Sequence, residues 1–309
     1  MTEYLSDTHS GAGASVLTSE AEYHSPPLEA LSFRFMIHGN EPLLGEYLET
    51  LLSSLAGGPS SGGPGDVHHY AVVGKPGGDV DLFRDEIRIA QLTDAWSAVA
   101  WLLWDLNQEV VRSTADCLLF HAGGLQSGDT GILLPAPSGS GKSTLVTALV
   151  RAGLGHLSDE LVAFNLMSER LLPFPKPITL KSGSFHFFEA LRPLDAPGPV
   201  AGPRGPVAEW FIRPDDIRWG SVGSACPPEI VVAPRYVTGA PTTLRSLSPD
   251  EAFLALALNT VNLDRVGADG ARVLGNLVER CACYELVMSD PSEAAELVLG
   301  LLGEGGSRS

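Results

Sequence analysis

Cysteine is scarce in this chain, which has four among 309 residues. The closest pair, Cys281 and Cys283, forms a Cys-x-Cys step without the further ligands that a zinc site needs. The sequence therefore predicts free thiols in a reducing compartment, and excludes a zinc module of the usual spacing.

Basic residues are also scarce: 20 lysines and arginines stand against 37 acidic residues, giving a net charge of -17 and a pI of about 4.8. So negative a surface repels phosphate backbones and anionic lipid headgroups. We expect neither nucleic acid nor a membrane as a partner. A nucleotide is an anion too, so a nucleotide site here would need local positive charge and a cation.

Long apolar runs are missing. The most apolar helical stretch, residues 95–106, is far shorter than the ~20 residues of a membrane span. Residues 1–27 are polar and acidic, without the basic and apolar regions of a secretory signal. These features predict a soluble, cytoplasmic protein.

Apolar residues make up 44% of the chain, enough for a substantial core, and the pattern predicts an α/β protein. We expect residues 1–27 to be disordered and residues 28–112 to form a small α/β module. Residues 113–303 would form a nucleotide-binding catalytic domain, and 304–309 a flexible tail. Residues 192–206, rich in proline and glycine, are predicted to be a mobile loop or lid.

The segment from Ala136 to Ser143 fits the phosphate-binding loop G-x-x-x-x-G-K-[ST], with alanine in place of the first glycine. An apolar strand precedes it and an amphipathic helix follows. In such loops the glycines let backbone N–H groups face phosphate oxygens, the lysine reaches the β and γ phosphates, and the hydroxyl binds Mg²⁺. The predicted nucleotide-binding residues are Ser138, Gly139, Ser140, Gly141, Lys142, Ser143 and Thr144.

Two adjacent acids, Asp159 and Glu160, begin seventeen positions after Lys142. After a short apolar stretch, such a pair can supply a magnesium ligand and a base for an attacking hydroxyl. The alternative is a solvated acidic turn. His121 ends a strand expected beside the one that enters the loop, where it is either structural or part of the site.

These elements together resemble the HPr kinase/phosphorylase family. The resemblance rests on residues 121–124, 137–143 and 155–162, and is close over about 115–165. It implies a fold related to the phosphoenolpyruvate carboxykinases, with a phosphate loop at its core. The remainder of the second half is similar to divergent HPr kinase-like proteins associated with peptide-modification gene clusters.

The resemblance also implies roles for single residues. Asp159 would act on the attacking hydroxyl, His121 would tune Asp159, and Glu160 with Ser143 would hold Mg²⁺. The second acid is usually aspartate in the family, so Glu160 is a departure. Members are often oligomers, which implies that this chain could be a homo-oligomer.

A larger departure is the missing arginine-glycine-leucine-glycine segment of the family, which puts HPr in doubt as the acceptor. Residues 173–181 stand in its place, where prolines fix an extended backbone around Lys176 and Lys181. These lysines either contact the nucleotide or transferring phosphate, or are solvated side chains of a rigid connector. Arg235, just after a predicted buried strand, is a further candidate for phosphate contact.

The sequence therefore predicts an ATP- and Mg²⁺-dependent kinase acting on a hydroxyl, with a serine of a peptide or protein as the favoured acceptor. Three alternatives remain open. They are a small-molecule kinase for an amino acid or sugar, a non-catalytic ATP-binding regulatory module, and phosphorolysis in the reverse direction.

Overall fold

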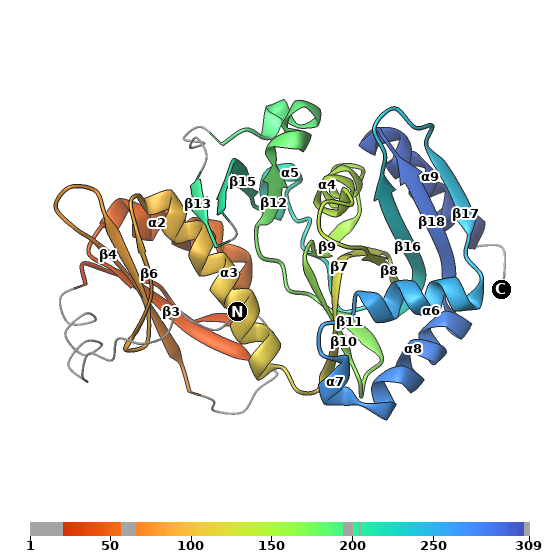
Figure 1. Cartoon of the computed structure of the whole chain (residues 1–309), viewed down its shortest axis with the longest axis horizontal. Coiled ribbons are helices and arrows are strands. Elements are labelled where there is room, and N and C mark those ends of the chain that lie inside the picture. Colours follow the sequence, from red (N-terminus) through yellow and green to blue (C-terminus); the bar gives the residue numbers. More distant parts are fainter. Residues whose placement is uncertain (1–20, 57–65, 194–199, 204, 306–309) are drawn as a thin grey trace. The chain divides into compact units, whose positions relative to one another are not determined.

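The computed structural model describes residues 21–56, 66–193, 200–203 and 205–305 (Figure 1). The predictions for residues 1–20 and 306–309 lie outside this range. The chain divides into two compact units. One is Met1–Leu106 with Pro199–Pro206, and the other is Asn107–Gly198 with Val207–Ser309.

The first unit is built on a mixed sheet whose order is β1-β3-β4-β5-β6, with β2 paired to β3. Strands β3 and β4 are parallel and the other pairs are antiparallel. Its buried core residues include Phe35 and Tyr70 of the sheet and Val99 and Leu103 of α3. The elements are β1 Tyr23–His24, β2 Leu28–Ala30, β3 Phe33–Gly39, α2 Pro42–Leu51, η1 Ser53–Leu55, β4 His68–Gly74, β5 Val80–Arg84, β6 Ile87–Leu92 and α3 Ala95–Ser113.

The second unit is built on an eight-stranded sheet of order β11-β10-β7-β8-β16-β18-β17, with β9 paired to β7. Strands β8, β16 and β18 are parallel, so their carboxyl ends share one edge. The strands are β7 Cys117–Ser127, β8 Thr130–Pro135, β9 Gly155–Ser158, β10 Leu161–Asn165, β11 Arg170–Leu172, β16 Pro228–Tyr236, β17 Thr243–Ser246 and β18 Ala282–Met288. A separate pair, β12 Ile178–Lys181 and β15 Glu209–Ile212, is antiparallel.

Helices cover both faces of this sheet (Figure 1). One apolar cluster packs α4 (Lys142–Arg151) and α9 (Pro291–Gly305) against Ile132, Val232 and neighbouring strand residues. The other packs α6 (Pro249–Leu258) and α8 (Ala268–Arg280) against Phe120 and Val231. Alternate residues of β16 therefore belong to opposite layers, as expected for a strand buried on both faces.

The structure confirms the mixed α/β class and differs from the sequence analysis in several places. Tyr23–His24 forms β1 within the segment expected to be disordered, because it pairs with β3. Between 192 and 206, β13 (Val200–Gly202) and β14 (Gly205–Val207) pair with each other; residues 194–199 and 204 lie outside the described part.

The boundary between the two units falls after Leu106, inside α3, and not at residue 112 as expected. The last turns of α3 belong to the second unit, where Asn107 donates a hydrogen bond to Glu160. Helix α9 continues to Gly305, beyond the expected start of a tail at 304. No helix among the described residues has both the length and the apolar character to cross a membrane.

Candidate functional site

The loop between β8 and α4 has the backbone that its glycines predict. Gly139 and Gly141 both adopt positive φ, of 85° and 86°, which other residues rarely adopt. Gly141 is the N-cap of α4. The loop is anchored from the neighbouring strand, because the N–H of Tyr236 at the end of β16 donates to the carbonyl of Ser140 at 3.0 Å.

Lys142, the first residue of α4, is 6% exposed. Its Nζ donates to the carbonyls of Ala136 at 2.5 Å and Pro137 at 3.0 Å, and lies 3.1 Å from Nε2 of His121. Burial lowers the pKa of Lys142 to about 8, against the opposing effect of nearby carboxylates. The amine is thus folded back onto its own loop, beside the histidine from β7.

Asp159 lies between β9 and β10 and is buried. Its Oδ2 accepts hydrogen bonds from Ser143 Oγ at 3.1 Å and from the backbone N–H of Thr179 at 3.2 Å. Its Oδ1 is buried without a hydrogen-bond donor among the described residues, and lies 4.0 Å from Lys176 Nζ. Burial raises the pKa of Asp159 above its ordinary value.

Glu160 is in a different environment from its neighbour. Its Oε2 accepts from Lys176 Nζ at 2.7 Å and from Asn107 Nδ2 at 2.8 Å. The Lys176 ammonium lowers the pKa of Glu160 to about 2, so this carboxylate is ionised. The pKa of Lys176, which burial alone would lower, is raised by the carboxylates of Glu160 and Asp159.

The predicted role of Lys176 changes with this placement. The sequence left two roles open for it: contact with the nucleotide or transferring phosphate, or a solvated side chain on a rigid connector. The structure instead buries the side chain, which is 1% exposed, against the two acids. Its contact is with carboxylates because residues 173–178 run past the turn between β9 and β10, where Phe174 N–H bonds the carbonyl of Leu157.

His121 pairs with Leu161 where β7 and β10 run side by side, and Leu161 directly follows the two acids in the sequence. The family resemblance implied that His121 would tune Asp159. In the structure its Nε2 lies at a hydrogen-bond distance of 3.1 Å from Lys142 Nζ, so His121 helps to position the lysine.

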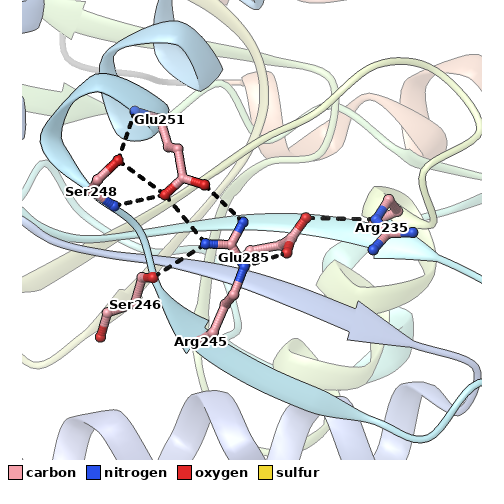
Figure 2. Close-up of polar contacts among 6 residues, drawn as sticks. All are labelled: Arg235, Arg245, Ser246, Ser248, Glu251 and Glu285. Atoms are coloured by element: carbon pink, nitrogen blue, oxygen red, sulfur yellow. Dashed lines mark hydrogen bonds and ion pairs between the residues drawn. The ribbon is translucent and has the colours of Figure 1, made fainter.

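The two remaining candidates occupy different places. Lys181, exposed at the end of β12, is close enough for its charge to lower the pKa of Lys142 further. Arg235 is not brought into this group. Its Nε lies 3.6 Å from Glu285 Oε1 in a network that Arg245 and Glu251 continue (Figure 2). Because side chains alternate along β16, Arg235 is on the α6 face, away from α4.

Two contributors were missed in the sequence. Asn107 follows Leu103 by one helical turn and so falls on the apolar stripe of α3, where a buried amide is a usable signal. Thr179 contributes only its backbone N–H, which leaves no trace in residue type.

Comparisons with known proteins add little to this description of the site. No protein-family model matches the chain, and no curated protein matches it. Among solved structures, it is similar to the Hpr(Ser) kinase/phosphatase from Coxiella burnetii, with a TM-score of 0.30 and 14% identity over 61% of this chain and 99% of that one. Such a low TM-score supports no conclusion about activity.

Proposed function

We propose that this chain is an ATP-dependent kinase that, with Mg²⁺, transfers the terminal phosphoryl group to a hydroxyl, with a serine of a peptide or protein as the acceptor. The observation that carries the proposal is the hydrogen bond between Ser143 and Asp159, 3.1 Å long. It places a buried carboxylate at the first turn of α4, where a glycine loop and a lysine converge.

The loop supports the phosphate-binding half of the proposal. The N-terminus of α4 presents backbone N–H groups that have no partner within the helix, together with the positive end of the helix dipole, and both favour an anion. Lys142 adds a charge whose burial is costly in the free protein. A bound triphosphate would relieve that cost by taking over the Nζ contacts now made by Ala136 and Pro137.

The two acids support the phosphoryl-transfer part of the proposal, because their environments shift their pKa values in opposite directions. Asp159 has a raised pKa, which makes it the better proton acceptor of the pair for an incoming hydroxyl. Glu160 is held ionised by Lys176. Unequal neighbouring carboxylates are typical of sites in which one acid moves a proton and the other stays charged.

The site also fits Mg²⁺, with Ser143 and Glu160 as the proposed ligands. No cluster of three or more histidine, cysteine or acidic side chains that could enclose a metal occurs in the described parts of the chain. Mg²⁺ in kinase sites needs less, because phosphates and waters complete its shell. The buried Oδ1 of Asp159, which accepts no hydrogen bond from the residues that the structure describes, is a further oxygen suited to a cation. When bound, Mg²⁺ would offset phosphate charge.

Label transfer from γ-labelled ATP tests this function. The purified chain is incubated with Mg²⁺ and either serine-containing peptides or small hydroxyl compounds, while ADP is measured. Labelled phosphoserine in the peptides is the expected result. Label in the small compounds would favour a small-molecule kinase. ATP that binds and stays intact with every acceptor would contradict the kinase and favour a regulatory module.

A further inference from the structure

Tyr236 is an exposed aromatic residue beside the phosphate loop. It is the last residue of β16, and 39% of its surface is exposed. In the described part of the chain, no aromatic ring stacks on it and no group hydrogen-bonds its hydroxyl. Its backbone, by contrast, is fixed, because its N–H donates to Ser140 of the loop at 3.0 Å.

The ring stands on the face of the sheet that carries α4. Ile230 and Val232 of β16 pack into the cluster formed with α4 and α9, and even-numbered residues of the strand share that face. A Cβ atom built on Gly141, the N-cap of α4, would lie 3.3 Å from Tyr236 Cβ. Tyr236 is therefore next to the start of the helix.

The order of the strands shows which residues lie on each side of the phosphate loop. His121 of β7 and the acids between β9 and β10 lie on one side of β8, and β16 with Tyr236 lies on the other. The loop itself follows β8. A nucleoside triphosphate with its terminal phosphate at Asp159 and its inner phosphates on the loop would extend toward β16.

We propose that the ring of Tyr236 is the stacking platform for the base of the bound nucleotide; this rests on the proposed nucleotide function of the loop. A flat, exposed ring with a fixed backbone stacks a base at little entropic cost. Every base has a π-face, so stacking of this kind serves adenine and guanine alike. The platform supplies affinity for the nucleoside, and the loop supplies affinity for the phosphates.

The test compares two ligands on matched variants by calorimetric titration in Mg²⁺. The ligands are ATP and inorganic tripolyphosphate, which has the same phosphate chain without a nucleoside. The variants are Tyr236→Ala, Tyr236→Phe and Trp219→Ala. Trp219 is a matched control because it is an exposed aromatic, at 87%, next to Arg218, which bonds carbonyls at the far end of α4.

We expect Tyr236→Ala to weaken ATP binding about ten-fold or more, the usual effect of removing one stacked ring. Its tripolyphosphate affinity should equal that of the wild type. Tyr236→Phe and Trp219→Ala should bind both ligands normally. Unchanged ATP affinity in Tyr236→Ala, or an equal loss for both ligands, would overturn the platform. If the wild type binds neither ligand, the nucleotide function itself fails, and the platform with it.

Discussion

The hydroxyl of Ser143 donates to Oδ2 of Asp159 at 3.1 Å, joining residues 16 positions apart. The bond links the first turn of α4 to the turn between β9 and β10. Helix α4 ends at Arg151 and β9 begins at Gly155, so the chain returns to the sheet almost at once. This short return is what brings the acids back to the loop, and it accounts for the spacing of seventeen between Lys142 and Asp159.

Replacing Asp159 with asparagine should separate binding from transfer. The amide keeps the shape and can still meet Ser143, but it cannot accept a proton from the acceptor hydroxyl. We expect transfer to fall about 100-fold or more, with ATP affinity changed little. Single-turnover assays and titration of ATP on the same preparation would measure both. Transfer at the normal rate in Asp159→Asn would show that the base is another group.

Replacing Lys176 with methionine should destabilise the protein strongly. The change leaves the Glu160 carboxylate, now paired at 2.7 Å, without its counter-charge. Loss of one partner of a fully buried pair costs about 3–5 kcal/mol, and because the Glu160 side chain is 29% exposed to water, we expect a smaller loss of about 1–3 kcal/mol. Lys181→Met, at the exposed end of the same segment, is the matched control and should change stability by less than about 0.5 kcal/mol. Urea unfolding measures both variants; equal midpoints would mean that the Lys176–Glu160 ion pair contributes nothing to stability.

The two loop glycines should respond differently to alanine. Both have positive φ, so each substitution costs about 1–2 kcal/mol of backbone strain. A Cβ at Gly139 meets nothing within 4 Å, whereas one at Gly141 comes 2.5 Å from Met288 Cε, which must move. Thermal unfolding should therefore show the larger loss for Gly141→Ala. The reverse order would mean that crowding at the helix start does not govern the loop.

The first unit should lose stability in mild acid through His38. Its ring lies between His24 Nδ1 at 2.7 Å and His69 Nδ1 at 2.8 Å, and burial, followed by these neighbours, lowers its pKa to about 4. The unfolded chain, with an ordinary pKa near 6.5, binds the proton more readily. Stability contributed by neutral His38 is therefore lost as the pH falls from about 6.5 to 4, by at most about 1.4 kcal/mol per pH unit.

Chemical unfolding of wild type and His38→Gln at several pH values would measure this loss. The variant should show a flatter dependence between pH 6.5 and 4, since glutamine takes up no proton. Parallel curves for the two proteins would assign the acid sensitivity to other groups.

Local patterns predicted the strand, loop and helix around Lys142 well, because residue spacing and glycine conformation are properties of neighbouring residues. The structure confirms the strand before the loop as β8 and the helix after it as α4. The apolar stretch 156–164 is two strands, β9 and β10, since Asp159 and Glu160 turn the chain between them.

Such local patterns could not predict contacts between residues that are far apart in the sequence. Nothing local shows that β16 lies beside β8, or that Asn107 and Lys176 meet at Glu160. The same limit explains Arg235. It was expected just after a strand, whereas it lies inside β16, one residue before the end. The face of its side chain depends on the register of β16, which is set by contacts distant in the sequence.

The most direct measurement of the central claim is calorimetric titration of Mg²⁺-ATP into the wild type and Lys142→Met, each shown to be folded by circular dichroism. If the loop from Ala136 to Ser143 holds the triphosphate, the wild type binds with one site per chain. Loss of the lysine charge should then weaken binding about 100-fold or more. Equal affinity in the two proteins, or no binding by the wild type, would contradict the account.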